Sequence, residues 1–275
     1  MNSRFNLNQK YLPREFNILI PKVTKRLLRV GRNQDGGYIV DKNILRNIKS
    51  LVSFGMSYEF SFELDLLRIN KNLKIKIFDH TVTHLFYLKN IFKIFRRFLT
   101  FRINFKNFLF VILDYFVFLK FIYDFRVNFY CLKIVKESTY KNEITPIKIF
   151  RDLLNSSSNI LLKIDIEGDE YKILKQVLFF HRNIDLIIIE FHNINKNQKI
   201  FFKFIKEFNK YYYNIHLHGN NHCFLTNCGF PDTIEITLIN KKKYFFNHNE
   251  SKNFPIKHLD YPNNPHKKDI VINFN

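Results

Sequence analysis

The chain has 275 residues, of which 46% are hydrophobic and 25% are charged, so it can bury one substantial core and is too apolar to be disordered. Its three cysteines are an odd number without a Cys-x-x-Cys pair, which argues against a disulfide framework or a zinc knuckle and fits a reducing compartment. The formal net charge of +20 would be consistent with binding to nucleic acid or to a membrane. Abundant Lys, Asn and Ile without Trp indicate a compositional bias instead, so we expect no specific nucleic-acid site.

Residues 1–48 are predicted to form an N-terminal lead-in. Its clearest signal is Asp35-Gly36-Gly37-Tyr38, because Asp-Gly-Gly between apolar residues is typical of a tight turn. The turn is either the tip of a plain β-hairpin or part of a functional loop. The first ten residues are polar, without the apolar stretch of a signal peptide, so we expect a cytoplasmic protein, with peripheral membrane contact left open.

Residues 49–78 have the size of one βαβ module. A short apolar strand is predicted at 49–54, an amphipathic helix at 59–69, and an alternating strand at 73–78.

Residues 85–131 are dense in Phe, Leu, Ile, Lys and Arg and contain no Gly or Pro. We predict a helical insert here, made of one or two long amphipathic helices. Three roles stay open: covering the sheet as a cap, lying on an anionic membrane, or binding another partner.

Strands and helices alternate again after the insert. Helices are predicted at 144–154, 169–179 and 201–208, and strands at 160–165, 184–189, 212–218 and 233–239. Alternating elements predict an α/β fold with a mostly parallel, Rossmann-like sheet, and the two last strands predict an antiparallel hairpin at its C-terminal edge. We therefore expect an α/β domain over 49–246 and an extended tail over 247–275.

Polar residues follow five of the predicted strands. They are Gly55; Asp79; Asp165 with Glu167; Glu190 with His192; and His218 with Asn220. Because ligands bind outside the carboxyl ends of strands in open α/β sheets, this pattern predicts one crevice along that edge.

Gly55 and Asp79 together predict a nucleoside site. A glycine after the first strand permits close backbone approach, and an acid after the second can accept hydrogen bonds from a ribose diol. The loop after Gly55 lacks the further glycines of G-x-G-x-x-G, so it is poorly suited to a pyrophosphate. That favours a cofactor without phosphates, such as S-adenosylmethionine.

The chain resembles the FkbM-like class I S-adenosylmethionine-dependent methyltransferases in an ordered set of segments. These are Arg32–Tyr38, Ser53–Glu63, Phe78–Thr81, Lys163–Glu170, Ile189–His192, His216–Asn221 and Leu259–Asn263. Lys163–Glu170, which reads KIDIEGDE, is the most specific of them. They cover most of the chain outside residues 85–140.

The resemblance implies that the first and fourth strands are neighbours, which places Gly55 beside Asp165 and Asp79 on the other side. The methionine part of the cofactor would lie near Gly55, Met56 and Tyr58, and the ribose near Asp79. Asp165 and Glu167 would face the sulfonium or the methyl acceptor.

A hydroxyl acceptor also needs a general base, and Glu190, His192 and His218 are candidates beside Asp165. Asp165 could instead cap the next helix, Glu167 and Glu170 could complement its dipole, and His218 could be a plain turn residue. We predict no metal, although Asp165, Glu190 and His218 together have suitable ligand types for a divalent ion.

The leading hypothesis is O-methylation of a sugar or small-molecule hydroxyl, with a glycan or small molecule as partner. The alternatives are a nucleotide-dependent oxidoreductase or sugar-modifying enzyme, and a basic membrane- or polyanion-associated protein with a degenerate site.

Overall fold

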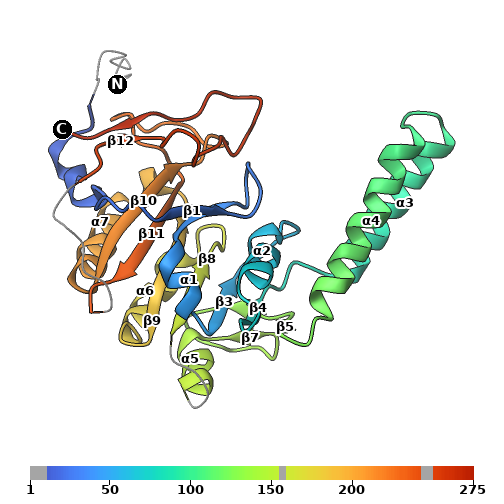
Figure 1. Cartoon of the computed structure of the whole chain (residues 1–275), viewed down its shortest axis with the longest axis horizontal. Helices are drawn as coiled ribbons and strands as arrows, with labels where there is room; N and C mark the ends of the chain where they lie inside the picture. Colours follow the sequence, from blue (N-terminus) through green and yellow to red (C-terminus); the bar gives the residue numbers. More distant parts are fainter. Residues whose placement is uncertain (1–10, 155–158, 243–249) are drawn as a thin grey trace.

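The computed structural model describes residues 11–154, 159–242 and 250–275. The first ten residues of the predicted lead-in and residues 247–249 of the predicted tail lie outside the described residues. Figure 1 shows a twisted central sheet with helices on both faces and a pair of long helices that projects away from it.

The central sheet has seven strands in the order β10-β11-β9-β8-β3-β4-β5. Their bounds are β3 (Ser50–Phe54), β4 (Lys74–Phe78), β5 (Val127–Tyr130), β8 (Ile160–Ile164), β9 (Ile184–Phe191), β10 (Tyr212–Gly219) and β11 (Ile234–Asn240). β11 runs antiparallel to both β9 and β10, and the other neighbouring pairs are parallel. This confirms the predicted α/β class, the mostly parallel sheet and the antiparallel C-terminal pair.

Five helices pack on the sheet. They are α1 (Lys42–Asn47), α2 (Ser61–Ile69), α5 (Pro146–Leu154), α6 (Glu170–Phe179) and α7 (Ile194–Tyr211). Buried side chains from α5, α6 and α7 join one core cluster, and those from α1 and α2 join the other. Adjacent residues of β8 divide between them: Leu162 belongs to the first cluster and Leu161 to the second. Because β8 is buried on both faces, it is apolar at every position except Lys163.

The lead-in contains a β-hairpin beside the sheet. β1 (Leu27–Val30) pairs antiparallel with β2 (Tyr38–Asp41), so the turn signal at 35–37 is the tip of a hairpin. Thr237 Oγ1 in β11 donates a hydrogen bond to the carbonyl oxygen of Ile39 at 2.7 Å. This bond ties the hairpin to the sheet.

The predicted insert forms two antiparallel helices, α3 (His84–Leu99) and α4 (Phe105–Ile122), which we call the helical hairpin. The insert is shorter than predicted, because residues 127–130 form β5 and pair with β4 instead of continuing a helix. Four residues rich in aromatics are too few for periodicity to separate a strand from a helix. Among the described residues, no helix is both long and apolar enough to cross a membrane.

The remaining elements are small. They are η1 (Arg14–Leu19) and the pairs β6 (Lys133–Ile134) with β7 (Glu143–Ile144) and β12 (Asn253–Phe254) with β13 (Ile272–Asn273). Phe254, Ile272 and Phe274 are buried in the same core cluster as Phe16 of η1. The described part of the C-terminal tail is thus packed against the domain.

Candidate functional site

The ends of β3 and β8 meet at Gly55. Its φ of +76° lies in the left-handed region, and an added Cβ would stand 1.7 Å from the carbonyl oxygen of Asp165. The Asp165 amide donates to the carbonyl of Phe54 at 2.9 Å, and the Gly55 amide donates to that of Phe78 at 3.0 Å. Glycine is therefore required here so that the first and fourth strands of the predicted fold can end side by side.

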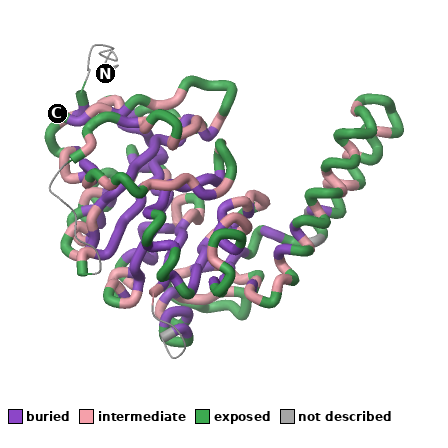
Figure 2. Tube along the Cα trace, in the orientation of Figure 1, coloured by how far each residue is buried: buried purple, intermediate pink, exposed green. Residues whose placement is uncertain are grey.

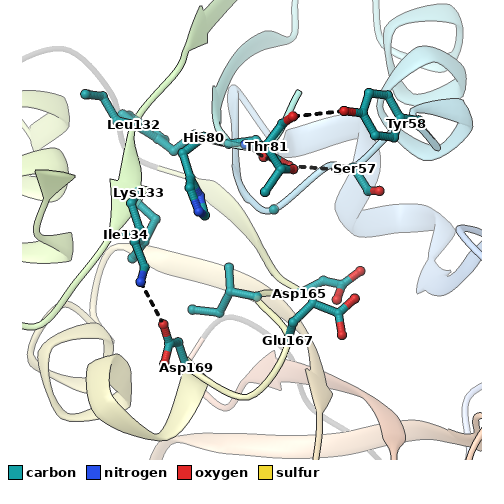
Figure 3. Close-up of a pocket in the computed structure, with 14 residues that line it drawn as sticks. Ser57, Tyr58, His80, Thr81, Leu132, Lys133, Ile134, Asp165, Glu167 and Asp169 are labelled. Carbon is teal, nitrogen blue, oxygen red and sulfur yellow. Dashed lines mark hydrogen bonds and ion pairs between the residues drawn. The ribbon is translucent and has the colours of Figure 1, made fainter. Parts of the chain in front are cut away.

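A cavity of about 370 Å³ opens beside this junction (Figure 3), and we call it the apolar cavity. Phe78, Leu132, Ile134 and Ile166 give it an apolar lining. Gly55, Asp79 and Asp165 also line it, so the structure brings the three predicted residues to one hollow. Lys133 and Asp169 form an ion pair at 3.6 Å on its wall.

Asp79 fastens the Gly55 loop to the end of β4. One carboxylate oxygen accepts from the amides of Met56 and Ser57, both at 2.8 Å. The other accepts from the amide and the hydroxyl of Thr81, at 2.7 and 2.6 Å. Burial alone would raise the pKa of Asp79, but these bonds outweigh it and the pKa is lowered. Each oxygen already accepts two bonds, so a ribose diol would have to displace some of them.

Tyr58 and Met56, both predicted to contact the cofactor, lie on different cavities. Tyr58 lines the apolar cavity and donates its hydroxyl to the carbonyl of Thr81 at 2.9 Å. Met56 is 2% exposed and lines a second cavity on the other side of the loop.

The second cavity encloses about 440 Å³, and we call it the acidic cavity. Five carboxylates line it: Asp35, Glu59, Asp165, Glu167 and Glu190. Tyr38, Lys163, His192 and Asn220 also contribute to its wall. Ser57, Asp165 and Glu167 line both cavities, so the two adjoin along these residues.

Asp165 and Glu190 are held close together in this cavity. Tyr38 donates its hydroxyl to Asp165 at 3.2 Å, and the Asn220 amide donates to Glu190 at 2.8 Å. Burial raises the pKa of Asp165 to about 6, although Lys163 and His192 oppose the shift. Burial also raises the pKa of Glu190 well above its ordinary value, and the charges of Asp165 and Glu235 add to this shift.

His192 supplies the positive charge between these acids. Its Nδ1 lies 3.2 Å from Glu170, which also accepts from the His192 amide at 2.6 Å. Its Nε2 lies 3.5 to 3.9 Å from the carboxylates of Glu167, Glu190 and Asp165. Burial opposes the charged form, but Glu170, Glu190 and Asp165 raise the pKa of His192 to about 10. A protonated imidazole is a poor base at neutral pH. The geometry therefore favours His192 as a positive charge that balances the carboxylates, rather than as the predicted general base.

His218 does not reach either cavity. It is 2% exposed, and its Nε2 lies 3.0 Å from Asp269 while its Nδ1 lies 3.7 Å from Glu235. Asp269 belongs to the C-terminal tail, which covers this end of β10. The predicted role of His218 as a base therefore lacks access to a substrate, and the side chain serves instead in a buried ion pair.

Sequence reasoning missed a buried ion pair below the acidic cavity. Lys163 in β8 lies 3.2 Å from Glu63 in α2, and both side chains are almost fully buried. The hydroxyl of Ser53 donates to the same Glu63 oxygen at 2.8 Å. A lysine within an otherwise apolar strand was the available signal, but nothing in the chain pointed to its partner.

Two groups of side chains have the ligand types for a divalent ion. Asp165, Glu190 and His192 form one group and Asp35, Glu190 and Glu235 the other, each with ligand atoms within 4.8 Å of one another. The combination with His218 that the sequence suggested is not among the groups formed by the described residues, because His218 faces Asp269. The expectation that no metal is needed stays a prediction.

No family model matches the chain, and no curated protein matches its sequence. Several solved structures are similar in fold. A caffeoyl-CoA O-methyltransferase candidate from Staphylococcus aureus is 12% identical, with 74% of this chain and 86% of that one covered and a TM-score of 0.36. A precorrin-6y C5,15-methyltransferase from Geobacter metallireducens is 11% identical, with 72% and 85% covered and a TM-score of 0.33.

A fibrillarin pre-rRNA processing protein from Methanococcus jannaschii is 8% identical, with 72% of this chain and 68% of that one covered and a TM-score of 0.35. At such values these likenesses carry no weight for function. The seven-stranded sheet with one antiparallel strand next to its edge establishes the Rossmann-like fold of class I methyltransferases on its own topology.

Proposed function

We propose that the chain is an S-adenosylmethionine-dependent methyltransferase that methylates a hydroxyl oxygen of a sugar or another small molecule. The observation that carries the proposal is the pair of adjoining cavities, which share Ser57, Asp165 and Glu167 at the carboxyl edge of the sheet. One cavity can hold a methyl donor and the other an acceptor, with the reacting atoms where they adjoin.

The apolar cavity fits the donor. Its volume of about 370 Å³ lies within the range of small-molecule sites. Leu132, Ile134 and Ile166 offer an apolar wall to a purine ring, and Asp165 and Glu167 offer negative charge to a sulfonium.

The acidic cavity fits the acceptor. Its carboxylates, the amide of Asn220 and the hydroxyl of Tyr38 accept and donate hydrogen bonds as a polyhydroxylated ligand requires. The same carboxylates would repel phosphate groups, so we infer a sugar or small alcohol without them.

S-adenosylmethionine supplies an electrophilic methyl group on a sulfonium when bound. We assign the base to Asp165, because it lines both cavities and receives a hydrogen bond from Tyr38. Asp165 would take the hydroxyl proton of the acceptor as the acceptor oxygen gains the methyl group and the sulfur keeps the electron pair of the broken carbon–sulfur bond. Protonated His192 would hold Glu190 and Asp165 in place during this step.

The FkbM-like resemblance supports a glycan or glycosylated acceptor within this proposal. Its segments converge here: Arg32–Tyr38 supplies Asp35 and Tyr38, and Ile189–His192 supplies Glu190 and His192 to the acidic cavity.

The test begins with calorimetric titration of S-adenosylmethionine into the wild-type protein and two variants of Leu132, a half-buried wall residue. We expect binding to the wild-type protein and to Leu132→Met, and at least about tenfold weaker binding to Leu132→Glu, which puts a charge against the purine. A parallel titration with NAD tests the nucleotide-dependent alternative. Binding of NAD without binding of S-adenosylmethionine would reject the proposal.

A further inference from the structure

The helical hairpin carries a large apolar surface away from the domain. Along α3 the exposed residues Leu85, Leu88, Phe92, Phe95 and Leu99 recur every three or four positions, which places them on one face. Along α4 the exposed apolar residues are Phe105, Leu109, Phe110, Leu113, Phe116 and Val117. In Figure 2 the fully buried part of the hairpin lies at its base, and the rest of its length is of intermediate burial or exposed.

Much of the apolar surface stays exposed although the two helices already contact each other through aromatic rings. Phe98 stacks on Phe108 at 5.3 Å, and Phe95 meets Phe108 at 5.8 Å, so ring contacts between the helices already exist. Phe101 at the tip is 96% exposed, and Phe92 and Phe116 remain 63% and 61% exposed. Exposed apolar residues gathered on a projecting element mark an interaction site.

Basic residues border this surface. Residues 84–122 contain seven lysines and arginines and a single acid, Asp114. Lys89, Lys93, Arg96 and Arg97 lie on one side of α3, next to its apolar face, because they too recur at helical spacing. Arg102 and Lys106 follow at the tip. An apolar face beside a basic one, with aromatic residues at the tip, is the arrangement of helices that lie in the interface of an anionic membrane.

We propose that the helical hairpin docks the protein onto the surface of an anionic lipid bilayer. Phenylalanine and leucine side chains would enter the headgroup region while the basic residues contact the acidic lipids. A second copy of the chain fits less well, because two hairpins with the same strong positive charge repel each other. Nucleic acid fits less well because it offers no apolar surface to cover the exposed rings.

The base of the hairpin adjoins the apolar cavity. Tyr87 of α3 packs edge-on against Tyr58 at 5.6 Å, and Tyr58 lines that cavity. Phe121 of α4 stacks at 5.1 Å on Phe60, the residue directly before α2. Docking through the hairpin would therefore tether the domain to the membrane through an element whose base lies beside the apolar cavity. This inference goes beyond the proposed reaction and does not depend on it.

The experiment is co-sedimentation of the full chain with vesicles of phosphatidylcholine, with and without phosphatidylserine. One variant combines Lys89→Gln, Lys93→Gln, Arg96→Gln and Arg97→Gln; a second combines Phe92→Ser, Phe110→Ser and Phe116→Ser. The charge-matched control combines Lys196→Gln, Lys199→Gln, Lys203→Gln and Lys206→Gln, four exposed lysines of α7. Circular dichroism checks that all variants fold, which we expect because the substituted residues are exposed.

We expect the wild-type protein to bind only the phosphatidylserine vesicles, with affinity falling as salt rises. Each hairpin variant should bind at least about tenfold more weakly, while the α7 control retains binding. Three results would overturn the proposal: no binding by the wild-type protein, an equal loss in the α7 control, or hairpin-dependent dimerisation or RNA binding without vesicle binding.

Discussion

The two cavities share one wall and differ in almost everything else. The apolar cavity is closed by a carboxylate, Asp79, whose oxygens are fully engaged by backbone amides and a hydroxyl. The acidic cavity contains carboxylates whose mutual repulsion is only partly relieved by Lys163 and His192. In the apolar cavity the Asp79 carboxylate holds a loop in place. In the acidic cavity the carboxylates of Asp165 and Glu190 can still bind a proton or a substrate. We therefore propose that the reaction takes place on the acidic side, and we expect substitutions in the two cavities to separate donor binding from methyl transfer.

The largest effect should follow Asp165→Asn, which removes the proposed base and keeps the size of the side chain. We expect methyl transfer to fall about 10²- to 10⁴-fold. S-adenosylmethionine binding should weaken much less, because Glu167 keeps a negative charge at the same wall of the apolar cavity. Transfer of an isotope-labelled methyl group to acceptors in a cell extract measures the first, and calorimetry the second. Glu137→Gln, which changes an exposed acid outside both cavities, serves as the control. Unchanged transfer in Asp165→Asn would show that the base lies elsewhere.

Lys163→Met should reduce stability most, because it leaves Glu63 buried without its cation. We expect a loss of about 3–5 kcal/mol in the free energy of unfolding, measured by urea denaturation. The double variant Lys163→Met with Glu63→Gln should recover part of this loss, since the uncompensated charge is then gone. If the double variant is no more stable than the single one, the ion pair is not what Lys163 contributes.

His218→Gln should lower the stability of the fold without changing the rate of methyl transfer. This variant tests whether His218 lies outside the acidic cavity. Burial opposes the charge of His218, but Asp269 and Glu235 raise its pKa from 6.5 to about 10, so the folded state binds the proton more tightly. The stabilisation is therefore complete below about pH 6.5 and is lost as the pH rises toward 10.

We expect His218→Gln to lose about 1.5–3 kcal/mol. The melting temperature should differ most from that of the wild-type protein below pH 6.5. A large fall in methyl transfer, measured where the variant is as fully folded as the wild-type protein, would show that His218 takes part in the reaction.

Asp79→Asn should have the smallest effect on stability, about 1–3 kcal/mol, because the amide can accept only part of the present hydrogen bonds. Since those bonds shape the wall of the apolar cavity, S-adenosylmethionine binding should weaken as stability falls. Calorimetry measures the binding and thermal melts measure the stability. Lower binding at unchanged stability would instead support direct contact between Asp79 and the ribose.

Much of the fold could be predicted because the strands are short apolar runs with polar ends. The rule that parallel strands end at one edge also placed Asp165, Glu190 and His192 together. The rule failed for His218, because this side chain contacts Asp269, 51 residues further along the chain. No local sequence pattern predicts that contact.

Two further features escaped prediction for the same reason. The partner of Lys163 lies 100 residues away, so only packing reveals it. Asp79 follows its strand as predicted, but its carboxylate binds the amides of the Gly55 loop. The spacing of Gly55 and Asp79 in the sequence cannot distinguish this role from ligand binding. Strand β5 was missed because its four residues, Val127–Tyr130, are too few for periodicity to separate a strand from a helix.

A crystal structure with S-adenosylhomocysteine tests the central claim most directly. We predict that the adenosine lies in the apolar cavity between Gly55, Leu132 and Ile134, with the thioether sulfur directed toward Asp165 and the acidic cavity. A ligand bound away from this cavity, or one whose sulfur faces away from Asp165, would contradict the claim that donor and acceptor meet at the end of β8.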